Sequence, residues 1–231
     1  MAIGRIKLHW DWKISDAKKH FEKALAINPN NAQALIQLGF CNMFMGSNEL
    51  AIERARTALT LDTFSLLNRL YIAGIQAYTK YIDEYLENGK KMIEIEPNFP
   101  SGYLIYGGAL ASKGLINEAV AEYEKAVSIY PDLNSLSALG TIYGLTGQKA
   151  KALDVIEKMK NIGTGQGGNY LFGNVYASIG ELDASFSFFD KAIEGRESFM
   201  LYIKMFLANV PKFWEDPRAK LLMEKIGLPD K

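Results

Sequence analysis

The sequence has little of the chemistry that catalytic and metal sites require. Among its 231 residues are one cysteine, Cys41, and two histidines, His9 and His20. A single thiol excludes an intrachain disulfide and a cysteine-rich structural zinc site. Neither histidine has the carboxylate and nucleophile spacing of a catalytic triad. We therefore expect a protein that is not an enzyme and holds no metal ion or cofactor, with Cys41 as a core residue rather than a reactive thiol.

The sequence also lacks net charge and long apolar runs. Lys plus Arg and Asp plus Glu number 26 each, so the formal net charge is zero. No overall field then attracts the protein to nucleic acid or to an anionic membrane. No run approaches the roughly 18 apolar residues of a membrane span, and charges interrupt residues 1–12, which excludes a secretion signal there. We expect a cytoplasmic protein that binds neither nucleic acid nor membrane.

The residues that are abundant, 48% hydrophobic and 12% aromatic, follow a helical spacing. The segment 98–131 shows it best, with small and aromatic residues three or four positions apart on two successive helices. These residues are Tyr103, Tyr106, Gly107 and Leu110 on the first helix, and Ala119, Tyr123 and Ala126 on the second. Because two helices cannot bury such faces alone, neighbouring copies must complete the core.

A period of about 34 residues supplies those copies. Prolines stand at Pro29, Pro97 and Pro131, and one column predicts the turn inside each helical hairpin. This turn column reads Trp12, Gly46, Lys80, Gly114, Gly147 and Gly180. The predicted repeats are residues 1–29, 30–63, 64–97, 98–131, 132–164 and 165–196, the first incomplete, followed by a C-terminal cap over 197–231.

The repeated pattern resembles that of tetratricopeptide-repeat (TPR) proteins, in which a bulky residue and Leu-Gly precede Ala-x3-Phe and a final Pro. The resemblance implies an all-α, right-handed superhelix of tandem hairpins with capping helices, as one domain over residues 1–231. The opening LHWDWKISDAKKHFEKAL and the ending PKFWEDPRAKLLMEKIGLP further resemble the repeat region of bacterial multidomain regulators. In those proteins the region follows a winged-helix, cyclase or kinase domain, which implies a sensory or partner-binding piece, excised from a longer protein.

Recurrent glycines inside helices predict close packing. Gly39, Gly107, Gly140 and Gly173 occupy one column where the two helices of a hairpin cross, although Gly lowers helix propensity. The third copy departs from the pattern. Bulky or polar residues replace the usual small and apolar ones at Arg69, Gln76, Tyr85 and Met92, and Gly89 replaces a bulky one. We expect a hairpin there with altered packing.

Two other stretches have a predicted local structure. The glycine-rich run Gly163–Gly168 follows a helix rather than a strand, so we interpret it as a turn between repeats and not as a phosphate-binding loop. After residue 196, aromatic residues at helical spacing predict a helix over 197–207. A second helix is predicted over about 216–226, with Pro217 at its start and Gly227 at its end.

The resemblance also implies a groove lined by the first helix of each hairpin, and residues were assigned to it in three columns. These groove columns contain small and apolar residues, which suit an apolar helix or extended peptide. The predicted groove residues are Ile36, Leu70, Leu104, Ser137 and Tyr170; Phe40, Gly74, Gly108, Thr141 and Asn174; and Met43, Ala77 and Ala111. The predicted partner is thus a protein or peptide.

Two alternatives stay open from the sequence. The tail near Phe206–Trp214 could fill the groove, or the chain could self-associate as a homodimer that brings together a fused output domain. The Lys and Asn pattern by which some tetratricopeptide repeats clamp a C-terminal carboxylate is missing, which argues against a chaperone-tail receptor.

Overall fold

The computed structural model describes residues 1–165 and 167–228. Gln166 of the glycine-rich run and the last three residues of the predicted cap lie outside the described residues. Within the described ranges every regular element is a helix, which confirms the all-α fold class. The chain divides into two compact units, Met1–Gly114 and Leu115 onward. Each is described by itself, and the single domain over 1–231 stays a prediction.

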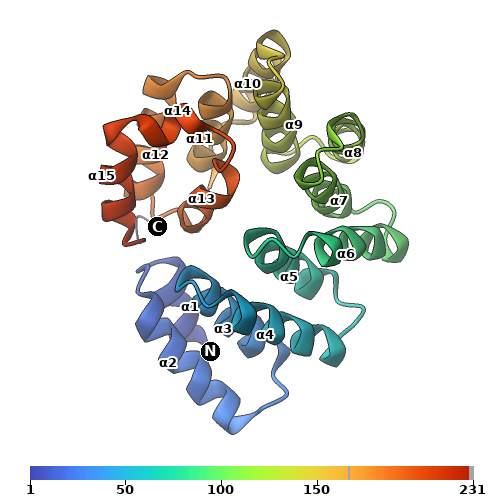
Figure 1. Ribbon diagram of the computed structural model, residues 1–231, viewed down its shortest axis with the longest axis vertical. Coiled ribbons are helices and arrows are strands. Elements are labelled where there is room, and N and C mark those ends of the chain that lie inside the picture. Colours follow the sequence, from blue (N-terminus) through green and yellow to red (C-terminus); the bar gives the residue numbers. More distant parts are fainter. Residues whose placement is uncertain (166, 229–231) are drawn as a thin grey trace. The chain divides into compact units, whose positions relative to one another are not determined.

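Unit 1 consists of consecutive helical hairpins (Figure 1). Its helices are α1 (Ala2–His9), α2 (Ile14–Ile27), α3 (Ala32–Phe44), α4 (Asn48–Leu61), α5 (Leu66–Tyr78), α6 (Ile82–Ile95) and α7 (Pro100–Ser112). Each helix packs against the next, and the first helices also pack against one another, α3 on α5 and α5 on α7. The first helices therefore form one side of the unit.

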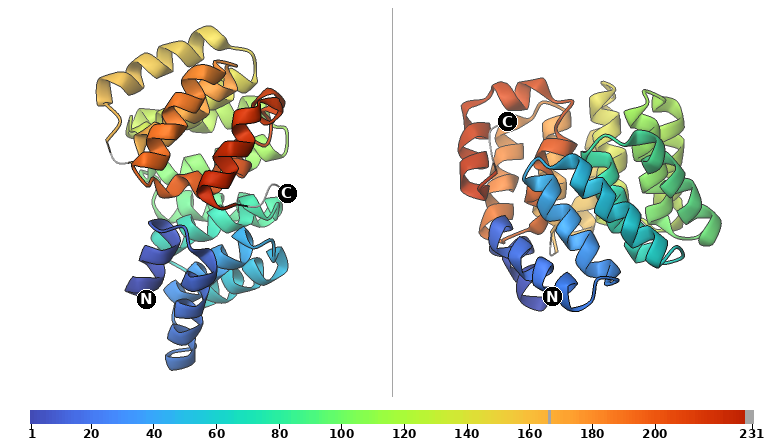
Figure 2. Two further views of the ribbon diagram at one scale, coloured as in Figure 1. Left: turned by 90° about the vertical axis from the view of Figure 1, so that its left-hand side faces the viewer. Right: turned by 60° about the horizontal axis from the view of Figure 1, so that its bottom comes forward.

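Unit 2 continues the pattern and ends in a tail of shorter helices. Its elements are α8 (Ile116–Ile129), α9 (Leu133–Leu145), α10 (Lys149–Ile162), α11 (Gly168–Ser178), α12 (Leu182–Glu194), the 3-10 helix η1 (Ser198–Tyr202), α13 (Ile203–Phe206), α14 (Pro211–Glu215) and α15 (Pro217–Ile226). Helix α9 packs on α11, and α15 lies beside α12 (Figure 2). Each predicted repeat thus contains one pair of consecutive helices.

The turn inside each hairpin is where the turn column placed it. All six residues have positive φ: 55° at Trp12, 79° at Gly46, 62° at Lys80, 78° at Gly114, 76° at Gly147 and 78° at Gly180. Only glycine adopts this left-handed conformation without steric cost. Four of the six hairpins therefore turn at no cost, and Lys80 and Trp12 are strained.

The predicted role of the helical glycines is confirmed at three positions. A Cβ on Gly39 would lie 3.3 Å from the carbonyl oxygen of Ala51, and one on Gly173 would lie 2.5 Å from the Phe189 ring. A Cβ on Gly140 would approach Val155 to 3.1 Å. In each hairpin the missing side chain lets the second helix approach the first.

The third repeat packs differently, as predicted, through two compensating glycines. Its oversized Tyr85 on α6 is buried, and a Cβ on Gly108 of α7 would lie 2.4 Å from the Tyr85 hydroxyl. Conversely, a Cβ on Gly89 would lie 2.7 Å from backbone atoms of Tyr106. In both contacts a glycine on one helix therefore makes room for a tyrosine on the helix that faces it.

The tail differs from the prediction between residues 197 and 207. One helix was expected, whereas Glu197 is extended, with φ −68° and ψ 117°, and a 3-10 helix and the four-residue α13 follow. The physical reason is that the Glu197 carboxylate bonds to the start of α11 and holds this residue outside the helix. The predicted last helix is confirmed: Asp216 caps α15, and Gly227 ends it with φ 70°.

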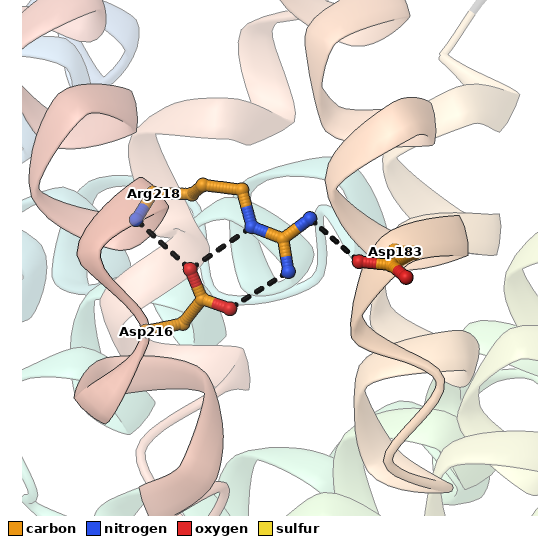
Figure 3. A network of polar contacts seen from close by, with 3 residues as sticks. All are labelled: Asp183, Asp216 and Arg218. Carbon is orange, nitrogen blue, oxygen red and sulfur yellow. Dashed lines mark hydrogen bonds and ion pairs between the residues drawn. The ribbon is translucent and has the colours of Figure 1, made fainter.

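Polar and aromatic contacts attach α15 to α12. The Arg218 guanidinium donates to Asp216 and, at 2.8 Å, to Asp183 Oδ1 on α12 (Figure 3). Arg218 also lies 4.4 Å above the Phe186 ring, and Lys225 pairs with Asp190 at 2.7 Å. The last helix thus covers the end of the repeats with its apolar side inward.

Candidate protein-interaction surface

The groove columns of α5 and α7 form a surface of small and apolar side chains within unit 1. The two helices contact each other, and all six predicted residues are half-buried, with part of each surface accessible. This α5–α7 surface comprises Leu70, Gly74, Ala77, Leu104, Gly108 and Ala111. None of these residues is charged, whereas charged pairs such as Arg56 with Glu84 lie on the second helices.

Two details define the edges of the α5–α7 surface. Leu67, one turn before Leu70 and Tyr71 on α5, is 53% exposed and extends the apolar stripe. The sequence assignment missed it, although its spacing from Leu70 and Gly74 was a usable signal. Gly108 faces Tyr85 of α6, so its lack of a side chain also serves packing.

The groove columns of α3 are buried. Ile36, Phe40 and Met43 each have 1% or less of their surface exposed. The Phe40 ring meets Tyr71 of α5 edge to face, with ring centroids 6.2 Å apart. These side chains contribute to the core of unit 1 rather than to an accessible surface.

In unit 2, three of the four predicted groove residues are buried. Ser137 donates from Oγ to the Leu171 carbonyl at 3.1 Å, and Thr141 alone is half-buried. Tyr170 and Asn174 on α11 are 0% and 1% exposed. The structure thus separates the groove columns into partly accessible residues on α5 and α7, with Thr141 on α9, and covered ones on α3 and α11, with Ser137 on α9.

The tail covers Tyr170. The Phe199 ring of η1 stacks on Tyr170 with centroids 5.9 Å apart, and Phe206 of α13 meets it edge to face, also at 5.9 Å. Burial keeps the pKa of the Tyr170 hydroxyl far above its usual range. The alternative in which the tail fills a groove position is therefore observed at this residue, within unit 2.

The few residues with reactive side chains are placed as packing elements. Cys41 is buried, and burial raises the pKa of its thiol to about 12, so the thiol is protonated at neutral pH. His9 Nε2 bonds Gln37 Oε1 at 2.8 Å, and burial lowers the pKa of this imidazole. In the part of the chain described, no cluster of His, Cys, Asp and Glu has metal-binding geometry, and no helix is long and apolar enough to cross a bilayer.

The polar residues of the third repeat form a buried network that sequence reasoning did not assemble. Arg69 donates from Nη1 to Asn88 Oδ1 and from Nε to the Thr63 carbonyl, both at 2.9 Å. Asn88 Nδ2 donates to the Arg69 carbonyl and, at 3.0 Å, to Gln76 Oε1. The sequence signal for this network was the presence of three polar residues, Arg69, Gln76 and Asn88, at positions that are normally apolar. Burial lowers the pKa of Arg69.

A hollow of about 280 Å³ lies over α8, α9 and α10 in unit 2. There the Tyr143 hydroxyl donates to Glu124 at 2.7 Å, and Lys151 lies 5.0 Å above the Tyr143 ring. Lys158 pairs with Asp154 at 2.8 Å. Burial and the Glu124 bond raise the pKa of Tyr143 to about 12. Because these polar groups pair with one another, the hollow offers a ligand no unpaired polar group among them.

Comparisons with known proteins agree with the helical-hairpin geometry. Residues 100–133, from α7 through α8, match the tetratricopeptide repeat family. The fold is similar to a tetratricopeptide repeat protein from Parabacteroides merdae, with TM-score 0.67 and 16% identity over 90% of this chain and 82% of that one. Together these findings support a tetratricopeptide-repeat protein. Such domains bind proteins or peptides, and the fold suggests an interaction scaffold.

Two further solved structures have a fold similar to that of this chain. A thermophilic TPR protein of Thermus thermophilus matches with TM-score 0.58 and 20% identity, over 78% of this chain and 99% of that one. PilF of Pseudomonas aeruginosa matches with TM-score 0.59 and 16% identity, over 84% and 88%. At these identities the likeness concerns the fold alone. No curated protein sequence matched significantly.

Proposed function

We propose that the protein is a non-catalytic interaction scaffold that binds an apolar peptide segment on the α5–α7 surface. The observation that supports it most is the accessible, uncharged character of this surface, together with one exposed leucine side chain in the first turn of α5 and one exposed phenylalanine side chain just before this helix. Leu67 is 53% and Phe64 71% exposed. An exposed apolar strip of this kind is typical of an interface. Small residues at Gly74 and Ala111 let a peptide backbone come close to the helices.

The cellular setting of the proposal rests on the resemblance of the chain's two ends to the repeat region of bacterial regulators. In that setting the scaffold is the cytoplasmic sensory or partner-binding region, and binding of a protein partner changes the activity of an output domain. Groove residues outside the α5–α7 surface, such as Thr141, belong to the proposal only where their surface is accessible.

Peptide display against the full chain tests the function. Peptides enriched on the wild-type protein are measured by fluorescence anisotropy on Leu104→Glu and on Leu153→Glu, a matched substitution at a 41% exposed position of α10. A buried charge facing an apolar peptide costs about 2 kcal/mol or more, so Leu104→Glu should weaken binding at least about 30-fold while Leu153→Glu leaves it unchanged. Equal affinities for both folded variants would contradict the proposal.

Self-association is the second candidate, and one observation favours it. Ile3 and Ile6 of α1 and Trp10, which follows the helix directly, stand three or four positions apart and are 57%, 55% and 54% exposed. A second copy of the chain covering this face gives a dimer whose two contact surfaces are identical. Sedimentation equilibrium of the wild-type protein and Ile6→Glu decides: this function predicts a dimer that the substitution converts to monomer. A concentration-independent wild-type monomer rejects it.

A further inference from the structure

Helix α1 is held firmly on its inner side. Leu8 is fully buried, and a Cβ on Gly4 would lie 2.7 Å from the Phe21 ring of α2, so glycine lets the two helices come close. At the end of α1, His9 Nε2 bonds Gln37 Oε1 of α3 at 2.8 Å. Contacts with both following helices therefore fix the orientation of α1 within unit 1.

The outer side of α1 carries an apolar stripe. Ile3, Ile6 and Trp10 stand at helical spacing, and each has more than half of its surface exposed. Gly4 and Leu8, which are buried, lie on the opposite side of the helix. Such a row of side chains forms a ridge that fits the grooves on the surface of another helix. We call these three residues the α1 stripe, and their spacing and exposure indicate an interface with a helix.

The free charges around the α1 stripe have one sign. Arg5, directly before Ile6, and Lys13 are exposed, and within the described part of the chain neither forms an ion pair. The one acidic residue among positions 1–13, Asp11, already pairs with Lys7 at 2.7 Å. The stripe is therefore bordered by net positive charge, which is complementary to an acidic partner.

These charges distinguish between possible occupants of the stripe. A second copy that paired the two α1 helices directly would bring Arg5 and Lys13 of one chain toward the same cations of the other, and like charges oppose association. A membrane surface requires a larger apolar face or a second anchor, whereas the stripe has three apolar side chains on a helix of eight residues. The charges and the size of the stripe thus favour an acidic helix.

We propose that the α1 stripe is a docking site for an amphipathic helix of another protein, whose apolar face is bordered by Asp and Glu side chains. The partner helix lies along α1 and buries the stripe, while its carboxylates face Arg5 and Lys13. Because Trp and Arg are enriched at binding hot spots, Trp10 and Arg5 are the expected anchors. This site lies on a different helix from the α5–α7 surface and goes beyond the scaffold function proposed there.

Two designed helical peptides of about 18 residues test the proposal. They share one leucine stripe and differ only in the flanking residues, which are Glu in one peptide and Lys in the other. Fluorescence anisotropy measures both peptides on the full-length wild-type protein and on four variants. The variants, all at exposed positions, are Ile6→Glu, Arg5→Glu and the matched controls Leu50→Glu on α4 and Lys125→Glu on α8.

The wild-type protein should bind the Glu peptide about 10-fold more tightly than the Lys peptide, because two unpaired cations attract one and repel the other. Ile6→Glu should remove binding of the Glu peptide, and Arg5→Glu should abolish the preference between the peptides. Both controls should keep the wild-type affinities. Equal affinities of the wild-type protein for the two peptides would overturn the inference, as would a preference that survives Arg5→Glu.

Further measurements identify other binding sites and occupants. Loss of Glu-peptide binding in Leu104→Glu but not in Ile6→Glu would place the peptide on the α5–α7 surface, which rejects the α1 site and leaves the scaffold function intact. The proposal predicts a monomer in sedimentation equilibrium and no co-sedimentation with phosphatidylserine vesicles. A dimer that Ile6→Glu dissociates, or vesicle binding that Ile6→Glu removes, would assign the stripe to a second copy or to a membrane and overturn the proposal.

Discussion

Lys80 is one of two residues, with Trp12, at which the turn column departs from glycine. Its φ of 62° matches the 76° to 79° of the four glycines at equivalent turns. The left-handed conformation costs a residue with a Cβ about 1–2 kcal/mol. Glycine avoids this cost, but it also gives the unfolded chain more conformational entropy, which cancels part of the gain in stability. Since the backbone there is set by the hairpin, the strain is local.

Lys80→Gly should therefore stabilise unit 1 by about 0.5–1 kcal/mol. The reciprocal change, Gly147→Lys, should destabilise the chain by about 1–2 kcal/mol, because it places a side chain at a φ of 76°. Urea denaturation of both variants measures these free energies. A loss of stability in Lys80→Gly would show that the lysine side chain contributes more than its backbone costs.

The buried network of the third repeat makes a second residue-scale prediction. Asn88→Leu leaves the Arg69 guanidinium without its side-chain acceptor and should cost about 2–4 kcal/mol. Replacing both residues, in Arg69→Met with Asn88→Leu, removes donor and acceptor together and restores the usual apolar core. The double variant should cost less than the sum of the single variants, and strict additivity in the double-mutant cycle would contradict a specific contact.

Sequence reasoning succeeded at residues whose role is set by the repeat itself. The turn column and the packing glycines recur every 33 or 34 positions, so the spacing alone predicted them. It failed where a partner lies outside the period. That Gly108 accommodates Tyr85, and that Glu197 caps α11, depend on contacts between helices that no spacing within one repeat reveals.

Among the elements, the position of α15 depends on a charged contact that titrates. Hydrogen bonds from Arg218 lower the pKa of Asp216 to about 2. In the unfolded chain this carboxyl takes up its proton near pH 4. The carboxylate therefore stabilises the folded state above about pH 4, and this stabilisation is lost as the pH falls from 4 toward 2.

Asp216→Asn should accordingly lower Tm at pH 7 and approach the wild-type Tm as the pH falls from 4 to 2. The asparagine keeps an acceptor for the Arg218 N–H but loses the charge that the guanidinium contacts. Thermal denaturation by circular dichroism across pH 2–7 measures the difference. The exposed neighbour in Glu215→Gln is the control, and a pH-independent Tm difference for Asp216→Asn would reject the assignment.

The tail shows why element boundaries were harder to predict than element existence. Aromatic positions Phe199, Tyr202 and Phe206 have helical spacing, which correctly indicated an apolar face. The predicted helix is interrupted because the Glu197 carboxylate accepts hydrogen bonds at the start of α11. The available signal in the sequence was the polar Glu197 at the start of an apolar segment, because a carboxylate that becomes buried needs hydrogen-bond donors.

For the whole molecule, the division of groove positions between accessible and covered residues carries the functional account. The residues of the α5–α7 surface are partly accessible, and in unit 2 the tail covers Tyr170. The family pattern placed accessible and covered residues in the same three columns. They are separated by the packing of α3 on α5 in unit 1 and by the tail in unit 2. Among the groove positions in the described part of the chain, those on α5 and α7 therefore form an accessible apolar surface, whereas Tyr170 on α11 is covered by the chain's own tail.

Hydrogen-deuterium exchange with a display-selected peptide tests this account most directly. The amides of the full-length protein are compared with and without the peptide, at a peptide concentration that saturates the protein. The account predicts slower amide exchange in α5 and α7, at Leu70 to Ala77 and Leu104 to Ala111. The exchange rates of the amides in α4 and α6 should stay unchanged. Protection confined to the second helices, with α5 and α7 unaffected, would contradict it.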